Sequence, residues 1–409
     1  MTAPGGPPLR VLVLDHTAEL GGAELALVRT CAALGPAVDV RVLLFADGPL
    51  RARLAEVGVR VDVVPLASSV ATTDRASAGR LSAATVAGAL RTLPFLWRLS
   101  RRVRALRPDV VHTTSLKADL LGIVPAAVAR RPLVWHVHDR IAPDYLPGPL
   151  VRVVRALARR APAAVVANSR ATAGTLPAVT AVAYPGFARE QAAGADAPAA
   201  ARADVPGPTV VMVGRISPTK GQLEVVRALR AVVDAVPAAR LRIVGEPAFG
   251  AEDYAALVRA EVTRLGLDDH VDLVGFVADP RAELDAAAVC VHASPVPEPF
   301  GQVVVEAMVR GVPVVATRAG GVEEILVDAE DAEDAEAADE GDAPLGLLVP
   351  PGDSDALATA VLDVLRDPAA ACERAQRARA SALRRFPVER TARVLTDVWT
   401  SVSGGARRA

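Results

Sequence analysis

Two series of short apolar segments, each alternating with helical patterns, run along this 409-residue chain. The first series begins with RVLVLD at residues 10–15 and ends with AVAYPGF at 181–187, and the second runs from TVVMVGRI at 209–216 to LGLLVPPGD at 345–353. Short β-branched runs separated by helices are typical of parallel sheets that carry helices on both faces. The chain is also longer than one hydrophobic core usually supports. We therefore expect an α/β protein with two doubly wound, Rossmann-like domains in tandem.

The domain boundaries follow from composition. Residues 188–208 are rich in Ala, Pro and Gly and lack apolar periodicity, which predicts an interdomain linker. We accordingly place an N-terminal domain at 1–187, a C-terminal domain at 209–385, and a C-terminal helix and tail at 386–409. Helical periodicity covers 371–400, across this last boundary, and the residues after it are expected to fray.

The charges are unevenly distributed along the chain. The net charge of −1 divides into 23 basic and 12 acidic residues over 1–186, and 23 basic and 35 acidic residues beyond, which includes an acidic run at 328–343. We expect that run to be a solvated surface loop. The basic half suggests an anionic partner, although ordinary drift in surface composition explains it equally well. Aromatic residues make up only 3% of the chain, which argues against a nucleic-acid surface built on base stacking.

The cysteines and the apolar segments bear on location. Cys31, Cys290 and Cys372 are odd in number and lack metal-binding spacing, which indicates a reducing compartment. The pattern of a signal peptide is not seen at the N-terminus, and apolar runs long enough to span a membrane are not seen either. We expect a cytoplasmic protein. The segment 91–108 has six Arg and no acidic residue, so peripheral contact with an anionic inner membrane face stays open beside the commoner solvated helix.

The segment EPFGQVVVE carries the clearest chemical signal. Glu298 stands in a Pro/Gly-rich loop, a helix start follows, and Glu306 comes eight residues later. Unpaired backbone N–H groups at a helix start attract phosphate, and carboxylates on either side of them suit sugar hydroxyls. The segment therefore predicts a site for a sugar attached to a phosphate.

A second signal lies in VGRISPTKG. It places Arg215 and Lys220 in a loop between a strand and a helix, beside Gly214 and Gly221. Two such cations can hold a diphosphate and stabilise its charge as a leaving group. An exposed loop with two solvated charges is the simpler alternative.

The N-terminal half offers weaker candidates. Gly21 and Gly22 follow the first strand, where they allow either close approach to a ligand or a turn with positive φ. His136 and His138 alternate onto one face of a strand, with Asp139 on the other face, at the end where open α/β sheets bind ligands. A structural role is the simpler expectation for at least one of these histidines, and two of them are weak support for a metal.

Further polar residues stand at two other strand ends. His112 closes a predicted strand, and Asn168 and Ser169 are suited to cap the helix that follows them.

A dehydrogenase is disfavoured because GGAEL is not the dinucleotide fingerprint and no acidic residue ends the second strand.

Taken together, these motifs resemble the GT-B glycosyltransferases, specifically the retaining glycosyltransferase family 4. The resemblance extends over nearly the whole chain, through GGAE, PDVVH, HVHD, VGRISPTKG, VGFV, EPFGQVVVEAMVRGVPVVATRAGG and GLLVPPGD. It implies the GT-B fold, in which two Rossmann-like domains face a central cleft and a C-terminal helix returns to the N-terminal domain. The N-terminal domain would take the acceptor and the C-terminal domain the nucleotide-sugar donor.

The resemblance also implies roles for matching residues. Arg215 and Lys220, in the loop opened by Gly214, would bind the donor diphosphate. Glu298 would contact hydroxyls of the donor sugar, and Glu306 would hold the ribose. The remaining donor contacts would come from the backbone at Phe300, Gly301 and Gln302, and from Gly21 and Gly22 of the other domain. His138 would lie near the reacting sugar, which makes His138, Arg215, Lys220 and Glu298 the expected catalytic residues.

The implied reaction is a metal-independent, cofactor-independent retaining transfer to a hydroxyl of a glycan, a lipid-linked glycan or a small molecule, with a role in cell-envelope glycoconjugate synthesis preferred. Two alternatives use the same motifs. An epimerase of the same fold would bind the nucleotide-sugar without an acceptor, and a non-catalytic module would bind it without turnover.

Overall fold

The computed structural model describes residues 7–66, 83–194, 207–248, 250–327 and 344–406. The chain divides into two compact units. Unit 1 comprises Met1–Gly186 together with Val388–Ala409, and unit 2 comprises Phe187–Pro387. The C-terminal segment thus returns to the N-terminal unit, as expected from the sequence.

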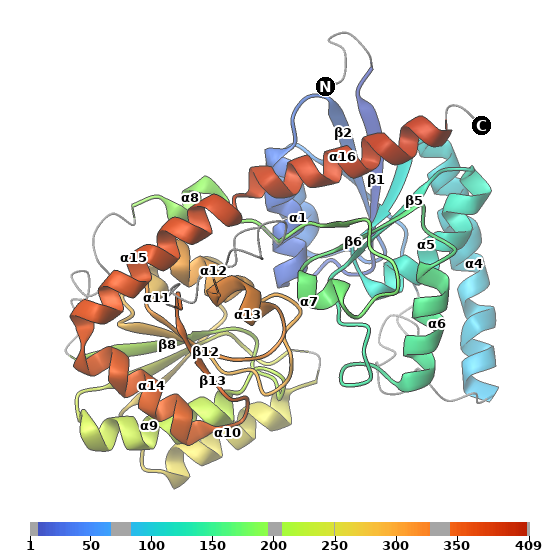
Figure 1. The fold of residues 1–409 in the computed structure, drawn as a ribbon. Coiled ribbons are helices and arrows are strands. Elements are labelled where there is room, and N and C mark those ends of the chain that lie inside the picture. Colours follow the sequence, from blue (N-terminus) through green and yellow to red (C-terminus); the bar gives the residue numbers. More distant parts are fainter. Residues whose placement is uncertain (1–6, 67–82, 195–206, 249, 328–343, 407–409) are drawn as a thin grey trace. The chain divides into compact units, whose positions relative to one another are not determined.

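Unit 1 is built on a seven-stranded parallel sheet in the order β3-β2-β1-β4-β5-β6-β7 (Figure 1). Its strands are β1 (Leu9–Asp15), β2 (Val38–Leu44), β3 (Arg60–Val63), β4 (Val110–Thr113), β5 (Leu133–Val137), β6 (Ala164–Ala167) and β7 (Ala181–Val182). The chain reverses direction across the sheet between β1 and β4, where Val13 pairs with His112. Open parallel sheets bind ligands at such a switch point, beyond the carboxyl ends of the strands.

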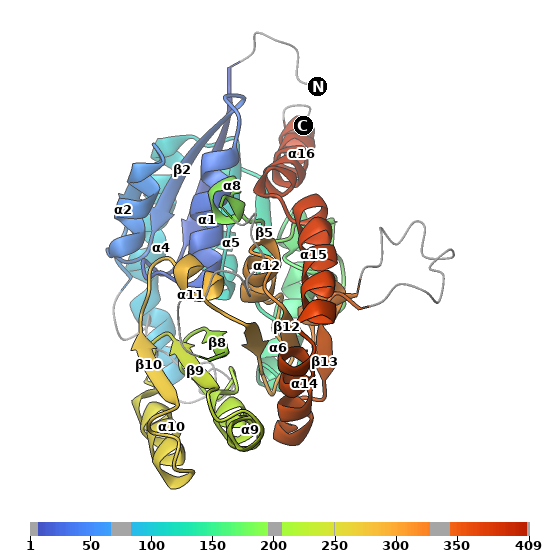
Figure 2. The same cartoon turned by 90° about the vertical axis from the view of Figure 1, so that its left-hand side faces the viewer.

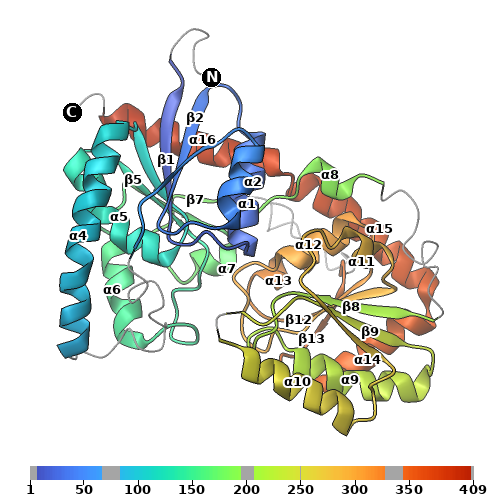
Figure 3. The same cartoon turned by 180° about the vertical axis from the view of Figure 1, so that it is seen from behind.

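Helices cover both faces of this sheet. They are α1 (Gly22–Ala33), α2 (Pro49–Glu56), α4 (Ala83–Leu106), α5 (Leu116–Ala129), α6 (Gly148–Ala158), α7 (Arg170–Ala173) and α16 (Val388–Ala406). Because side chains alternate along a strand, Leu12 and Leu14 pack with α4, α5 and α6, while Val11 and Val13 pack with α2 and α16. α4 and α5 lie side by side, and α16 runs beside α1 (Figures 1 and 3).

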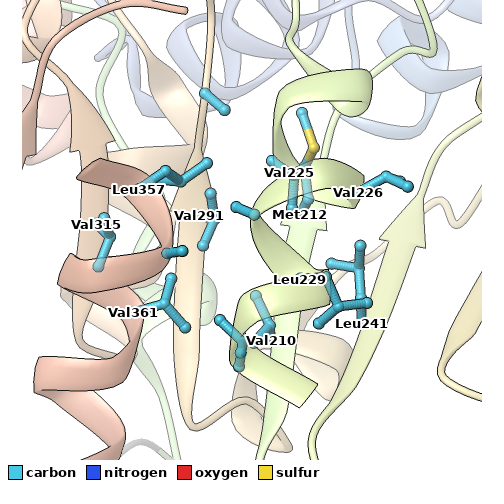
Figure 4. Close-up of a cluster of buried hydrophobic side chains, with 14 of the residues drawn as sticks. Val210, Met212, Val225, Val226, Leu229, Leu241, Val291, Val315, Leu357 and Val361 are labelled. Carbon is cyan, nitrogen blue, oxygen red and sulfur yellow. The ribbon is translucent and has the colours of Figure 1, made fainter. Parts of the chain in front are cut away.

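Unit 2 repeats the plan with a six-stranded parallel sheet in the order β10-β9-β8-β11-β12-β13. Its strands are β8 (Thr209–Val213), β9 (Arg240–Val244), β10 (Val271–Gly275), β11 (Val289–His292), β12 (Val314–Thr317) and β13 (Leu347–Val349). Its helices are α8 (Arg189–Ala192), α9 (Gln222–Ala235), α10 (Glu252–Arg264), α11 (Arg281–Asp285), α12 (Gln302–Val309), α13 (Gly321–Leu326), α14 (Ser354–Arg366) and α15 (Pro368–Arg385). α9 and α14 lie side by side in Figure 2. Valine and leucine side chains from these two helices meet Val210, Leu241 and Val291 of the sheet in a continuous core (Figure 4).

Some local expectations need correction. The helical stretch expected at 371–400 is two helices, because Pro387 cannot continue a helix and disfavours helical geometry at Phe386. The second helix, α16, extends to Ala406, so most of the expected tail is helical. Of the expected linker 188–208, Arg189–Ala192 form α8 in unit 2. Residues 195–206 and the acidic run 328–343 lie outside the described residues.

Candidate functional site

The loop that follows β8 holds the two predicted cations. Gly214 leaves the strand with φ 153°, Arg215 is exposed, and the Lys220 N–H donates to Ser217 O at 3.0 Å, so the chain turns back sharply. Gly221 ends the loop in the left-handed region, and a Cβ there would lie 1.9 Å from Ala293 O. Only glycine both adopts the left-handed conformation and leaves room for Ala293 O, and this close packing fixes Lys220 against the end of β11.

Gln222, the first residue of α9, holds the loop from inside. Its side chain is fully buried, its Nε2 donates to Arg215 O at 2.9 Å, and its Oε1 accepts from Ser217 N at 3.4 Å. A buried amide that satisfies two backbone groups restricts the loop. The sequence analysis missed this residue, because a polar side chain at a helix start is ordinarily solvated.

Lys220 and Glu298 form the central ion pair of the site. Lys220 Nζ donates to Glu298 Oε1 at 2.7 Å, and the two side chains are 22% and 17% exposed. Glu298 Oε2 lies 3.6 Å from His292 Nε2. Burial alone would raise the pKa of Glu298, but the Lys220 ammonium and the neighbouring His292 more than offset it, so its pKa is lowered and the carboxylate is ionised. The structure thus brings together two of the residues that the sequence singled out.

His292 is a further component that sequence reasoning did not find. It ends β11 and is 6% exposed, and among the described residues its ring nitrogens have no partner within hydrogen-bond distance, since the contact with Glu298 is 3.6 Å long. Buried ring nitrogens with so few polar contacts are rare in folded proteins. The only signal in the sequence was a histidine at the carboxyl end of an apolar strand, six residues before Glu298.

Gly320 and Gly321 hold the Glu298 loop in place through backbone contacts. The Gly321 N–H donates to Glu298 O at 2.9 Å, and Gly320 and Glu298 form a parallel bridge. Gly320 has φ 71°, and a Cβ there would lie 2.2 Å from Glu298 O. The pair GG in ATRAGG therefore serves close backbone packing behind Glu298.

The helix start predicted after Glu298 is confirmed. Gly301 caps α12 with φ 104°, and the helix begins at Gln302. Phe300 is 2% exposed and packs edge-to-face on Phe386, with 5.7 Å between ring centroids, so its ring belongs to the core. The first N–H groups of α12 carry partial positive charge that suits a phosphate.

Glu306 lies further along α12 and is half-buried. Gln191 Nε2, from α8, donates to Glu306 Oε1 at 3.4 Å. Arg310 holds α8 on unit 2 by donating to the carbonyl oxygens of Gln191 and Ala193, at 3.1 and 2.5 Å. Glu306 therefore faces a segment that was expected to be a linker.

In unit 1, Gly21 and Gly22 form the start of α1. Gly21 caps the helix in an extended conformation with φ −107°, and neither glycine has positive φ, so the left-handed turn considered from the sequence is wrong. A Cβ at Gly21 would lie 2.4 Å from Glu24 Oε2. The glycine thus leaves room for a carboxylate at this helix start.

Three histidines line one face of the unit 1 sheet. The ring centroids of His112 and His136 are 5.4 Å apart, and those of His136 and His138 are 4.2 Å apart. Burial lowers the pKa of His112 to about 3, with a contribution from His138. Burial also lowers the pKa of His138 to about 4, although Asp139 and Asp15 oppose the shift. Burial lowers the pKa of His136 as well, so the three rings are uncharged near neutral pH.

Other polar side chains gather at the carboxyl ends of β1, β4 and β6. Thr114 Oγ1 donates to Asp15 Oδ2 at 2.8 Å, and His16 Nδ1 lies 2.8 Å from Ser115 Oγ. Asp15 and His16 were absent from the sequence-based candidates, since their partners are 99 residues away. Ser169 caps α7, as expected, by accepting from Thr172 N at 2.9 Å.

Among the described residues, no group of three or more His, Cys, Asp and Glu side chains is arranged to hold a metal ion. Within the same part of the chain, no helix is both long and apolar enough to cross a membrane.

Two known protein families match this chain, one in each half of the sequence. Residues 196–384 match the family described as glycosyl transferases group 1, and residues 20–182 match the family described as Glycosyltransferase Family 4. Together with the two parallel α/β units, these matches identify the chain as a glycosyltransferase with the GT-B fold.

Individual relatives agree with this assignment. The chain is 29% identical to a glycogen synthase of Mycobacterium tuberculosis over 325 residues, which are 75% of this chain and 72% of that protein. It is 31% identical to a D-inositol 3-phosphate glycosyltransferase of Streptomyces scabiei over 54% of this chain and 55% of the relative. Among solved structures, the Anabaena protein HepE in complex with UDP and glucose superimposes with a TM-score of 0.79 and 29% identity, over 96% of this chain and all of HepE.

Proposed function

We propose that this glycosyltransferase moves a hexose from a UDP-sugar to a hydroxyl acceptor with retention of configuration. The observation that carries the proposal is the Lys220–Glu298 pair, 2.7 Å apart, in unit 2 beside the helix start at Gln302. One fixed cation, one ionised carboxylate and a set of helical N–H groups match a diphosphate joined to a sugar. UDP is favoured because HepE, which is similar over its whole length, was solved with UDP and with UDP-glucose.

In this proposal Lys220 and Arg215 hold the diphosphate and stabilise the charge that develops as it leaves. Lys220 Nζ donates to Glu298 Oε1, and a bound diphosphate would compete for the same ammonium. Glu298 would then accept hydrogen bonds from sugar hydroxyls through its freed oxygen. Glu306 would hold the ribose in place of Gln191. Front-face attack by the acceptor, with the leaving phosphate taking the proton, requires neither a protein nucleophile nor a metal.

The donor is tested by a thermal-shift screen of UDP-, GDP-, ADP- and dTDP-sugars with and without EDTA. A ligand that binds only the folded protein raises its melting temperature by mass action. We expect the largest shift with a UDP-hexose and no effect of EDTA. A larger shift with a GDP-sugar would refute the choice of base, and no shift with any of the sugars would refute the donor site. Formation of an epimer from the donor alone would instead identify an epimerase.

We further propose that the acceptor belongs to the cell envelope and that unit 1 contacts an anionic membrane face from the cytoplasmic side. Leu93 and Trp97 of α4 are 56% and 60% exposed, and the Arg101 guanidinium lies 4.6 Å from the centre of the Trp97 ring. These residues are spaced four apart and share one side of the helix. Apolar and basic side chains so arranged suit an interface with anionic lipid. Co-sedimentation with anionic but not neutral vesicles is expected, and its absence would remove this part of the proposal.

A further inference from the structure

One hydrogen bond fixes a proton in the core of unit 1. The indole Nε1–H of Trp399, in α16, donates to Nδ1 of His112, in β4, at 3.2 Å. Both side chains are buried, at 2% and 1% exposure. An indole nitrogen can only donate, so His112 Nδ1 must carry a lone pair, and the ring proton of neutral His112 must sit on Nε2. The C-terminal helix therefore selects one tautomer of this histidine.

The constraint extends to neighbouring rings. His112 packs against His136 at an interplanar angle of 60°, and His136 packs against His138 at 44°. Trp399 itself stands edge-on to His112, with 5.4 Å between centroids. These contacts, edge-to-face for Trp399–His112 and His112–His136 and tilted for His136–His138, form a continuous series of rings, here called the stack, from α16 through β4 to the carboxyl end of β5. The last ring, His138, is half-buried and lies near the carboxylates of Asp15 and Asp139.

Packing alone does not hold these rings. A cavity of about 20 Å³ lies beside them, lined by Thr114, Thr391 and Leu395 as well as by the stack. That is about the space of one water molecule. His136 Nε2 is buried without a hydrogen-bond partner in the described part of the chain. The indole N–H of Trp399 is therefore the polar contact that fixes the His112 ring, while the His136 ring is also bonded to the backbone of Ala183.

We infer that Trp399 is a positioning residue, whose indole N–H fixes the tautomer of His112 and, through the stacked rings, the orientation of His138. This rests on the proposed function only in placing His138 beside the reacting sugar. The charged groups that face the stack are Asp15 and Asp139, and the other titratable groups beside it are the histidines themselves and the Cys31 thiol, whose pKa is raised by burial. Burial lowers the pKa of all three rings, so they are uncharged near neutral pH.

The test is Trp399→Phe, which keeps a buried aromatic ring and removes only the donor. Trp97→Phe, on the exposed side of α4, is the matched control. In ¹⁵N-histidine spectra near pH 7, with His112 and His138 assigned by single substitutions, wild-type His112 should show an unprotonated Nδ1. In Trp399→Phe that resonance should move toward the tautomer average, and the His138 resonances should shift with it. Trp97→Phe should leave all of them unchanged.

Activity supplies the second arm, measured as UDP release from UDP-glucose. Loss of one buried hydrogen bond should lower kcat about fivefold in Trp399→Phe while the KM for UDP-glucose, bound by unit 2, is unchanged. A protonated Nδ1 in wild-type His112 would overturn the inference even if the variant fails to fold. Unmoved His138 resonances in a folded variant would also overturn it. By contrast, full activity in His138→Ala would refute the proposed place of His138, and an inert UDP-glucose would refute the proposed donor, while the spectra still decide the inference.

Discussion

The carboxyl edges of the two sheets are built with different chemistry on the same topology. In unit 2 the edge carries an ion pair, Lys220 with Glu298, held by backbone that only glycine permits at Gly221 and Gly320. In unit 1 the edge carries stacked rings with lowered pKa values, anchored by a tryptophan from the C-terminal helix. A rigid edge with a fixed cation suits an anionic leaving group, whereas neutral imidazole rings beside the carboxylates of Asp15 and Asp139 suit hydroxyl groups. The contrast is what we expect if unit 2 takes the donor and unit 1 the acceptor, as proposed.

The largest expected effect comes from removing the cation of unit 2. Lys220→Ala should lower kcat for UDP release from UDP-glucose by about 10²–10³-fold, the usual loss when a charge-stabilising group is deleted. Lys220→Arg, which keeps the charge on a different shape, should restore part of the rate. Arg259→Ala, on the exposed face of α10, is the control and should have no effect. A wild-type rate in Lys220→Ala would show that the cation of unit 2 does not stabilise the leaving group, which would contradict the proposed contrast between the two edges.

Glu306 tests whether unit 2 also holds the nucleoside. Glu306→Ala should weaken UDP binding by about 10- to 100-fold, because a hydrogen bond to a carboxylate contributes roughly 1.5–3 kcal/mol. Titration calorimetry with UDP measures this directly. Glu373→Ala, exposed on α15, should bind like the wild type. Unchanged affinity in Glu306→Ala would mean that the contact with Gln191 is structural only.

Backbone rigidity in unit 2 can be isolated with two glycines of similar φ. Gly320 has φ 71° and Gly352 has φ 76°, but a Cβ at Gly320 would lie 2.2 Å from Glu298 O, whereas the space at Gly352 is open. Both substitutions to Ala incur left-handed strain of about 1–3 kcal/mol, and only Gly320→Ala adds a clash. We therefore expect Gly320→Ala to lower both the melting temperature and UDP affinity more than Gly352→Ala does. Equal effects would show that the Glu298 loop is adaptable.

Much of this architecture could be predicted because its signals are local. The apolar run at 10–15 corresponds to β1 (Leu9–Asp15), and PFG before QVVVE corresponds to the start of α12. Strand alternation correctly placed His136 and His138 on one face. Period-two patterns, glycine-rich turns and helix starts each depend on a few neighbouring residues. They fixed the fold class and the loops that carry the unit 2 cluster.

The rest depends on contacts between distant residues. The Trp399–His112 bond joins residues 287 apart, and the Lys220–Glu298 pair joins residues 78 apart. Nothing near Trp399 in the sequence distinguishes it from an ordinary core residue. The helix that carries it continues to Ala406 because its buried face packs on unit 1, and tertiary packing rather than propensity stabilises most helices. The break at Pro387, in contrast, had a visible signal.

The smallest expected effect is a difference in acid sensitivity between the units. The histidines of unit 1 have pKa values below the ordinary 6.5. As pH falls from about 6.5 toward 4, these histidines are therefore protonated in the unfolded protein but not in the folded one, and unit 1 loses stability. Asp119 opposes this because burial raises its pKa, but it is one group against three. In unit 2 the lowered pKa of Glu298 gives stability that is complete above the ordinary value of 4.5 and is lost only below it. Hydrogen exchange near pH 7 and about pH 5, corrected for intrinsic rates, should therefore show lost protection in β4 and β5 but not in β11 and β12. Equal losses in both sheets, or an earlier loss in unit 2, would contradict the contrast between neutral histidines in unit 1 and an ionised carboxylate in unit 2.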